Sequence, residues 1–511
     1  MIKPTLEEAR NLAKGYNVVP IAFEMLADTF TPINLFLSLK DSYENCFLLE
    51  SVDNGEQWGR YSFIGFNPKA EIKIKNATVT MIDKNGTTEI KTDNPINFIT
   101  ELLSKYKSPK VKDMPKLTGG LVGYFAYDTI RYVEKRLKNT PVNDLDMPDC
   151  HFVLCDEIIA FDHLKNKIVI IVNVSIQGDL DKNYNEGVAR TKEIAREIMY
   201  ATPVRKIKEP KGATAAIATV AAAASATSAS ATGEITISSN LTKDEFIANV
   251  NAAKEYIRNG DIFQVVLSQR FEANNPPDSF DVYRMLRATN PSPYMYYFKF
   301  SDYYIAGASP EMLVSVEDNL ISARPIAGTI KRGRDEKEDK EFENMLISDK
   351  KEQAEHTMLV DLGRNDVGKV SRFGSVEVTH FMRVEKYSQV MHLVSDLKGE
   401  LRDDRTSLDA LMAVIPAGTL SGAPKIRAME IIDELEKQKR GLYGGTSGYI
   451  AYNGDIDTCI AIRTVLFKNN KAYVQAGAGI VADSIPEKEF EETESKAKAM
   501  IKAIVEARDM L

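Results

Sequence analysis

Short runs of alternating apolar and polar residues fill the first 200 positions, with stretches of helical spacing between them. Asn85-Gly86 separates two alternating runs, 77–82 and 88–92, and predicts a β-hairpin. Thr5 and Glu8 form a capping box and predict a helix that ends near residue 15. The further elements expected in this part are helices at 95–106 and 183–200 and strands at 119–132, 152–162 and 167–175.

The same mixture resumes beyond a segment of different composition. Residues 213–233 consist almost entirely of Ala, Thr and Ser without an apolar face, which is typical of a linker. A second capping box, Thr242 to Glu245, predicts a helix that ends near Gly260, and a strand follows at 262–271. We therefore expect an N-terminal region at 1–207, a linker at 208–237 and a C-terminal region at 238–511.

Neighbouring strand-like runs favour antiparallel sheets. The runs 303–308 and 312–316 are close enough to pair as a hairpin, and they predict an α+β fold with large antiparallel sheets. Residues 119–127 and 444–452 also match at six of nine positions. This match indicates two equivalent strands in two related halves, or a chance likeness between glycine- and tyrosine-rich strands.

The helix pattern at 349–363 contains a carboxylate where apolar residues are expected. Glu355 falls between Leu359 and Leu362 on the helical wheel, inside an apolar arc. Burying an unpaired carboxylate costs on the order of several kcal/mol. Glu355 is therefore expected to meet a cation.

A second helix pattern, at 486–497, carries carboxylates of its own. Glu489, Glu492 and Lys496 share one face beside an apolar stripe. Two such helices far apart in the sequence predict a hard cation between them, most simply Mg²⁺ with water and an anionic ligand. The alternative is that both helices present solvated acidic faces.

Composition narrows the class of protein without identifying it. The 511-residue chain is 44% hydrophobic and 27% charged, with a net charge of −8, so no nucleic-acid partner is expected. It has no apolar stretch of about 20 residues, the length of a membrane span, and no signal-peptide segment at its start. These features predict a cytoplasmic protein. The four cysteines lack CxxC spacing and are expected to be buried thiols.

Three glycine-rich segments in the C-terminal region indicate an anion site. Glycine lets backbone N–H groups approach an anion closely. None of the segments matches a dinucleotide or P-loop motif, so a nucleotide is not implied. With Lys425, Arg463 and Lys496 they predict a small polyanionic ligand; the segments are 324–329, 416–425 and 475–479.

Long motifs in residues 240–500 resemble the chorismate-binding enzyme family. This family includes anthranilate, aminodeoxychorismate, isochorismate and salicylate synthases. The first 200 residues resemble the N-terminal region of its anthranilate-forming members. The motifs are Pro-Ile-Ala-Gly-Thr at 325–329, Glu-His-Thr-Met-Leu-Val-Asp-Leu-Gly-Arg-Asn-Asp at 355–366, Leu-Ser-Gly-Ala-Pro-Lys at 420–425 and Ala-Gly-Ala-Gly-Ile-Val-Ala-Asp-Ser at 476–484.

The resemblance implies a chorismate-utilising fold, with antiparallel sheets packed as a sandwich and helices outside. It also implies a catalytic C-terminal domain with Mg²⁺ bound by Glu355 and Glu492, and leaves Glu352 and Glu489 as supporting candidates. Arg463 suits a dicarboxylate such as chorismate, because its fork binds a carboxylate through two nitrogens. The implied substrate-site residues are Gly328, Thr329, Tyr443, Arg463, Gly477, Ala478, Gly479 and Lys496.

Two positions indicate which nucleophile the chain uses. Family members that add water resemble each other in a lysine base where this chain has Gln264. Aminodeoxychorismate synthases typically have Pro-Ile-Lys-Gly-Thr, whose lysine is a nucleophile, where this chain has Ala327. Both substitutions favour ammonia as the attacking group and anthranilate as the product.

The implied reaction adds ammonia to the ring, expels the 4-hydroxyl and then loses pyruvate. Glu311 is placed by resemblance to protonate the leaving hydroxyl, a role that a raised pKa favours. Thr329 lies in the same implied catalytic group. His392 is the family's histidine near the ring, with core packing as the alternative. His356 is expected to support the ligand Glu355.

Two further partners are implied. The chain has no Gly-x-Cys-x-Gly elbow, so ammonia is expected from a separate glutamine amidotransferase subunit. The segments at 48–51 and 290–295 resemble those that bind the inhibitor L-tryptophan in feedback-regulated relatives. Ser51, Pro293, Tyr294 and Met295 are the expected contacts, and Glu50 is a candidate for the amino group.

Two alternatives stay open at the sequence level. The first is aminodeoxychorismate synthase, a family member with another product. The second is a non-catalytic subunit that senses tryptophan or acts as a scaffold. The presence of Glu311, Thr329, Glu355, Arg463 and Glu492 argues against the second.

Overall fold

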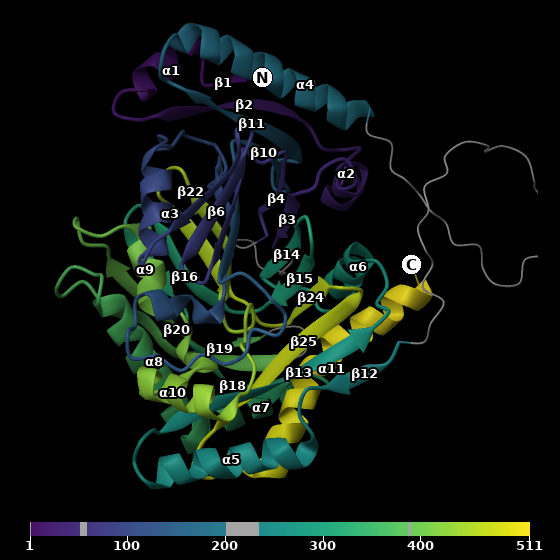
Figure 1. Ribbon diagram of the computed structural model, residues 1–511, viewed down its shortest axis with the longest axis vertical. Helices are drawn as coiled ribbons and strands as arrows, with labels where there is room; N and C mark the ends of the chain where they lie inside the picture. The colour runs from purple at the N-terminus through teal and green to yellow at the C-terminus, as the bar shows by residue number, and fades with distance from the viewer. Residues whose placement is uncertain (1, 52–58, 201–234, 387–389, 511) are drawn as a thin grey trace, which may run out of the picture.

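The computed structural model describes residues 2–51, 59–200, 235–386 and 390–510. They form two large antiparallel β-sheets with helices on the outer faces (Figure 1). The α+β class expected from the sequence is therefore confirmed. The Ala/Thr/Ser segment at 213–233 lies outside the described residues.

The first sheet contains 13 strands of the described chain. In spatial order these are β1 (Ile2–Lys3), β2 (Val18–Leu26), β11 (Lys167–Ser175), β10 (Glu157–Asp162), β4 (Tyr61–Phe66), β3 (Cys46–Glu50), β14 (Tyr294–Lys299), β15 (Tyr304–Ser309), β24 (Thr464–Lys468), β25 (Lys471–Ile480), β13 (Gln264–Asn274) and β12 (Ile237–Ser239), with β21 (Gly422–Ala423) paired to β13.

The second sheet contains 12 described strands. Their order is β18 (Ile326–Lys331), β20 (Val390–Glu400), β17 (Leu320–Ala323), β16 (Met312–Glu317), β23 (Ile456–Ile460), β22 (Thr446–Ala451), β8 (Gly120–Phe125), β9 (Cys150–Cys155), β5 (Ala70–Lys75), β6 (Thr78–Asp83) and β7 (Gly86–Lys91), with β19 (Glu377–Lys386) paired to β20.

The helices pack on the outer faces of these sheets. Helix α4 crosses β2 and β11, α11 lies along β25, and α8 covers β18 and β20 (Figure 1). The described helices are α1 (Leu6–Leu12), α2 (Pro32–Leu39), α3 (Pro95–Ser104), α4 (Leu180–Tyr200), α5 (Lys243–Arg258), α6 (Ser279–Thr289), α7 (Glu336–Ser348), α8 (Lys350–Gly368), α9 (Ser407–Val414), α10 (Lys425–Leu435), α11 (Pro486–Met510) and the 3₁₀ turns η1 (Tyr127–Tyr132) and η2 (Gly418–Leu420).

Apolar side chains from both sheets meet in a shared core. Phe47 and Phe298 of the first sheet pack in one cluster with Val122 and Tyr449 of the second. Burying such side chains stabilises the fold by roughly 25 cal/mol for each Å² of apolar surface that is removed from water. The sandwich implied by the resemblance is therefore confirmed. The four cysteines are buried and free, as expected.

Each sequence region supplies strands to both sheets. Strand β3 pairs with β14, and β8 pairs with β22, so residues before 200 and after 235 share each sheet. The boundaries at 207 and 238 stay predictions. The two matching segments, 119–127 and 444–452, are neighbours across this junction, with Gly123 opposite Gly448.

The strand expected at 119–132 is wrong in its second half. Strand β8 ends at Phe125, and η1 follows. The backbone leaves the sheet because Tyr127 N donates to Gly441 O at 2.8 Å. Within the turn, Arg131 Nε donates to Asp128 Oδ1 at 2.7 Å and holds the tight conformation.

The hairpin expected from 303–308 and 312–316 is also wrong. Strand β15 pairs with β14 and β24 in the first sheet, whereas β16 pairs with β17 and β23 in the second. Pro310 stands between them and has no N–H to donate to a ladder. The chain therefore crosses from one sheet to the other at Pro310 and Glu311.

No helix in the described ranges combines the length and apolar character that crossing a bilayer requires.

Candidate active site

Glu311 lies where the chain passes between the two sheets. Its backbone carbonyl accepts from Ile460 N at 3.0 Å, and its Oε1 accepts from Thr419 Oγ1 at 3.1 Å. Desolvation raises the pKa of the Glu311 carboxyl to about 7, although Thr419 and Lys496 both lower it. The carboxyl borders a cavity of about 60 Å³. It can therefore be protonated, and so donate a proton, near neutral pH.

Thr329 and His392 face each other across β18 and β20. Gly328 sits at an irregularity of this ladder with φ +64°, a conformation that glycine adopts without strain. His392 Nδ1 lies 3.0 Å from Thr329 Oγ1 and 3.1 Å from Gly328 O. Since a carbonyl oxygen only accepts, Nδ1 carries the proton. Desolvation lowers the pKa of His392, which favours the neutral ring.

A glycine-rich wall brings two other side chains together. Gly477, Ala478 and Gly479 lie on β25, opposite β13. A Cβ on Gly477 would lie 2.7 Å from the Tyr443 hydroxyl, and one on Gly479 would lie 2.7 Å from Gln264 Nε2. Glycine at these two positions thus leaves the space that Tyr443 and Gln264 occupy.

The two expected cations meet beside this wall. Lys496 Nζ donates to Gly477 O at 3.0 Å and pairs with Glu492 Oε1 at 2.7 Å. The Arg463 guanidinium donates to the carbonyl of Lys496. Desolvation lowers the pKa of Arg463, but a guanidinium keeps its proton in proteins. Both cations therefore already have partners inside the protein, Lys496 a carboxylate and Arg463 a backbone carbonyl, and an anionic ligand would have to share them.

Carboxylates of α8 and α11 come within electrostatic reach of one another. Glu355 Oε1 accepts from Gln264 Nε2 at 3.1 Å. The pKa of Glu352 is raised by desolvation and then by Glu355, Asp349 and Glu492. The pKa of Glu489 is raised by desolvation and also by Glu492. Carboxylates from the two helices therefore repel one another across the gap.

This excess of negative charge fits a divalent cation. Mg²⁺ is commonly held by one or two carboxylates, with water and ligand oxygens completing the shell. Among the described residues, no three or more His, Cys, Asp or Glu side chains form a ready-made metal cluster. A site here would thus rest on Glu355 and Glu492 with oxygens from a ligand.

Two residues singled out from the sequence lie outside this arrangement. Lys425 is buried and donates to Asp366 Oδ2 at 2.6 Å, so its charge is used inside the protein. His356 is also buried, with Nε2 2.6 Å from Ser395 Oγ. Desolvation lowers the pKa of His356 to about 4. It joins α8 to β20 rather than facing a ligand.

The expected tryptophan contacts line one cavity of about 710 Å³ between the sheets. Ser51, Pro293, Tyr294 and Met295 all border it. Glu50 borders it too, but its carboxylate accepts from Tyr283 at 2.7 Å and Arg287 Nε at 2.9 Å. Ser62 Oγ also donates to this carboxylate at 3.5 Å, so Glu50 already has three partners within the protein. Residues 52–58, which follow Ser51, lie outside the described chain.

Thr419 is a site residue that sequence reasoning missed. It lies inside the glycine-rich segment 416–425, which was assigned to anion binding as a whole. Its hydroxyl contacts Glu311, 108 residues earlier. The contact forms only when η2 packs against the segment at Pro310 and Glu311, where the chain passes between the sheets. No local pattern in the sequence could therefore have revealed it.

Comparison with known proteins places the chain in a family. A family model described as "chorismate binding enzyme" matches residues 44–502. The chain therefore belongs to this family of chorismate-binding enzymes.

The similar proteins carry a more particular name. "Anthranilate synthase component 1" from Acetivibrio thermocellus is 50% identical over 511 residues, which is 100% of both chains. The protein of that name from Aquifex aeolicus (strain VF5) is 45% identical over 98% of this chain and 97% of its own. The crystal structure of anthranilate synthase component I from Streptococcus pneumoniae TIGR4 is 39% identical, with a TM-score of 0.74, over 93% of this chain and 98% of that one.

Proposed function

We propose that this chain is the large subunit of an anthranilate synthase, which converts chorismate and ammonia to anthranilate and pyruvate. In that role it would catalyse the first committed step of tryptophan biosynthesis, in the cytoplasm. The observation that carries the proposal is the placement of Glu311. Its carboxyl lies between the sheets, accepts from Thr419 and has a pKa of about 7. The names of the full-length relatives support the same activity.

Chorismate carries two carboxylates, which match the positive side chains of the site. Arg463 binds one carboxylate through its two-nitrogen fork, and Lys496 faces the other. The backbone at 477–479 approaches the ring closely because glycine leaves room there. The Tyr443 hydroxyl, directed at Gly477, fixes the edge of the bound ring.

Mg²⁺ held by Glu355 and Glu492 would neutralise a substrate carboxylate and orient the ring when bound. Gln264 keeps Glu355 in place through its 3.1 Å hydrogen bond. Glu352 and Glu489, whose carboxyl pKa values are raised, would support the shell through water or by charge.

The chemistry uses a proton held on Glu311. Ammonia attacks the ring beside the carboxylate-bearing carbon, and the C4–O bond breaks as Glu311 donates its proton to the departing hydroxyl, which leaves as water. Removal of the ring proton at the aminated carbon then breaks the ring C–O bond to the enolpyruvyl group and gives the aromatic ring. The group leaves as the enolate of pyruvate, which takes up a proton at its methylene carbon to become pyruvate. His392, neutral and hydrogen-bonded to Thr329 and Gly328, is placed to assist that second step.

Ammonia is the nucleophile that agrees best with Gln264 and Ala327, because neither side chain can act as a base or as a nucleophile. Gln264 has no basic nitrogen and cannot take a proton from water. Ala327 has no functional group with which to attack the ring. Neither residue opposes free ammonia, which needs no activation by a base. The ammonia would come from a separate glutamine amidotransferase subunit, consistent with the "component 1" in the relatives' names.

Regulation by L-tryptophan is part of the proposal. The cavity between the sheets has room for an indole, and Pro293 and Met295 supply apolar surface. Ser51 supplies a hydroxyl to its lining.

Anthranilate fluorescence tests the function directly. The purified chain is incubated with chorismate, Mg²⁺ and an ammonium salt at mildly alkaline pH. We expect fluorescence to rise with the wild-type chain and to be lost with Glu311→Gln, which keeps the side-chain shape but cannot donate the proton. Accumulation of aminodeoxychorismate would identify the other ammonia-using synthase. No consumption of chorismate would identify a non-catalytic subunit.

A further inference from the structure

A buried arginine joins several walls of the candidate site from behind. The Arg440 side chain is 1% exposed and forms an ion pair with Glu436 at 2.6 Å. Its Nη1 donates to Leu420 O and its Nη2 to Val266 O, each at 2.6 Å. Its guanidinium carbon also lies 5.7 Å from the ring centre of Tyr443.

Each of these contacts reaches a segment that carries a site residue. Leu420 follows Thr419, which donates to Glu311. Val266 lies two residues after Gln264 and pairs with Gly479. Tyr443 is the aromatic residue at the glycine wall. One guanidinium therefore sets the relative positions of three elements whose side chains enter the site.

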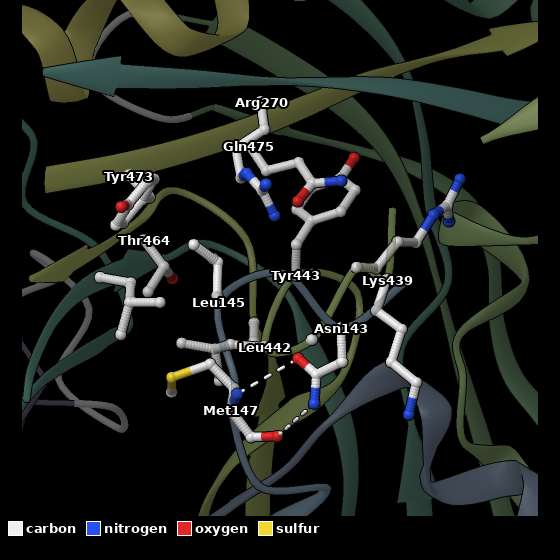
Figure 2. A pocket seen from close by; sticks show the side chains of 14 residues that line it. Asn143, Leu145, Met147, Arg270, Lys439, Leu442, Tyr443, Thr464, Tyr473 and Gln475 are labelled. Carbon is white, nitrogen blue, oxygen red and sulfur yellow. Dashed lines mark hydrogen bonds between the residues drawn. The ribbon is translucent and has the colours of Figure 1, made fainter. Parts of the chain in front are cut away.

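Glu436 extends the same network along β13. Its Oε1 accepts from Ser268 N at 2.8 Å and from Ser268 Oγ at 2.9 Å. Gln475 Nε2 in turn donates to Ser268 Oγ at 2.8 Å. Gln475 and Tyr443 border the small cavity behind the glycine wall (Figure 2). The backbone behind Gly477 is thus held by charge-assisted hydrogen bonds.

Buried ion pairs contribute little net stability on average, because desolvation offsets their attraction. A fork of donors in fixed geometry instead specifies one arrangement of its acceptors. We propose that Arg440 is a positioning residue for the reaction: it holds the backbone of η2 so that Thr419 meets Glu311, and it holds β13 and Tyr443 in register with the glycine wall. This role rests on the proposed function.

The Arg440→Lys variant tests it. Lysine keeps the charge opposite Glu436, but one ammonium cannot reach both carbonyls and both carboxylate oxygens in the same geometry. We expect kcat to fall roughly 10- to 100-fold, as small displacements of catalytic groups do, with a change in KM for chorismate of less than about threefold. Because Thr419 would no longer stabilise the Glu311 carboxylate, the alkaline limb of the kcat–pH profile would move to higher pH.

A double mutant separates positioning from a general loss of stability. Thr419→Val removes the hydrogen bond that Arg440 is proposed to align, so Arg440→Lys combined with Thr419→Val should be little worse than Arg440→Lys alone.

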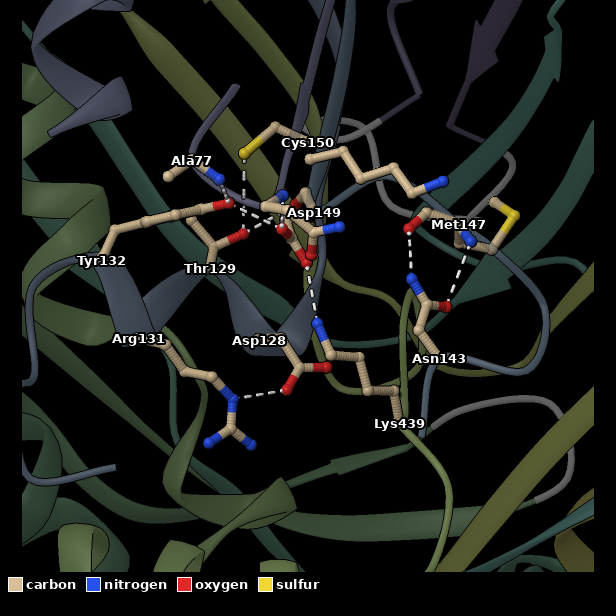
Figure 3. A network of polar contacts seen from close by, with 12 residues as sticks. Ala77, Asp128, Thr129, Arg131, Tyr132, Asn143, Met147, Asp149, Cys150 and Lys439 are labelled. Atoms are coloured by element: carbon tan, nitrogen blue, oxygen red, sulfur yellow. Dashed lines mark hydrogen bonds and ion pairs between the residues drawn. The ribbon is translucent and has the colours of Figure 1, made fainter. Parts of the chain in front are cut away.

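The matched control is Arg131→Lys. Arg131 is another arginine with low exposure that pairs with Asp433 of α10 at 2.6 Å and with Asp128 at 2.7 Å (Figure 3 shows the Asp128 contact). It also donates to the carbonyl of Asn139, and Asp128, Asn139 and Asp433 all lie outside the site segments. The Arg131→Lys variant should lower the melting temperature without moving kcat or the pH limb.

The outcomes are distinct. An Arg440→Lys enzyme with wild-type kcat and pH limb, or one whose effect multiplies fully with that of Thr419→Val, would overturn the positioning role. If Arg440→Lys does not fold, Glu436→Asp takes its place, since it keeps both charges but draws the carboxylate back, and we expect the same limb shift with a smaller loss of kcat. A wild-type chain that forms no anthranilate would overturn the proposed function, and the positioning role with it.

Discussion

At the scale of single residues, environment matters more than residue type. Glu311 has an ordinary glutamate side chain, but it lies between the two sheets, where desolvation raises the pKa of its carboxyl to about 7. Motif resemblance predicted Glu311 as an acid, and no pattern in the sequence predicted the burial behind it. That burial arises because β15 of the first sheet ends before Pro310, and the chain then passes to β16 of the second sheet.

The pH dependence of kcat tests the role of Glu311. A general acid must be protonated, so at a constant concentration of unprotonated ammonia we expect kcat to fall as pH rises through about 7. Thr419→Val removes a hydrogen bond that stabilises the carboxylate. The limb should therefore move to higher pH by roughly one unit. The rate of anthranilate formation, followed by fluorescence in a stopped or continuous assay at each pH, measures this shift.

A control is needed because the concentration of free ammonia also changes with pH. The concentration of ammonium salt is adjusted at each pH so that free ammonia stays constant, and ionic strength is held with an inert salt. A limb that stays in place in Thr419→Val, or that moves to lower pH, would show that Glu311 is not the group that titrates.

At the scale of elements, the helical wheel was only partly right. Glu355 is half-buried beside the buried face of α8 rather than inside it, and Ala354 of the expected apolar arc is exposed. Glu352 of α8 and Glu492 of α11 do come within electrostatic reach of each other. The capping boxes at Thr5 and Thr242 begin helices as expected. Local patterns succeed here because a cap or an apolar stripe involves residues only a few positions apart.

Removal of the carboxylates tests the metal site. We expect EDTA to abolish anthranilate formation, and Glu355→Gln or Glu492→Gln to raise the Mg²⁺ concentration for half-maximal rate by at least roughly tenfold. Glu491→Gln is the matched control, because Glu491 is an exposed glutamate of α11 directly beside Glu492, and the substitution removes the same charge.

Isothermal titration with Mg²⁺ in the presence of chorismate gives a readout that does not depend on turnover. Binding of equal strength in the wild-type chain and both variants would place the metal elsewhere.

At the scale of the whole molecule, the sheets are built from distant parts of the chain. Sequence reasoning predicted sheets but paired 303–308 with 312–316, since adjacency is the only pairing signal that one sequence offers. In the structure β15 and β16 belong to opposite sheets, and β8 pairs with β22 from the other region. Long-range pairing of this kind creates both Glu311's position and the cavity between the sheets.

That cavity lies next to the smaller cavity beside Glu311. Met312 and Arg324 border both the larger cavity and the small one beside Glu311. A ligand that shifts the sheets would therefore disturb Glu311 through its own chain neighbour. The contacts expected from the resemblance do lie together, although their role in binding stays a prediction.

Tryptophan titration tests this regulation. We expect L-tryptophan to inhibit anthranilate formation in the wild-type chain. Ser51→Phe, which adds a bulky side chain to the lining of the cavity, should raise the inhibitory concentration by at least about tenfold, or roughly 1.4 kcal/mol. Ser301→Phe is the control, since Ser301 is exposed in the turn after β14. Equal inhibition of wild type and Ser51→Phe would locate the inhibitor at another site.

The most direct measurement is the stoichiometry of products from chorismate and ammonium. Anthranilate is quantified by fluorescence after chromatography, and pyruvate by a coupled dehydrogenase, in the same reaction with the wild-type chain and Mg²⁺. The proposed function predicts anthranilate and pyruvate in equal amounts, with no isochorismate and no aminated product that retains the enolpyruvyl group. Chorismate converted without release of pyruvate would contradict it.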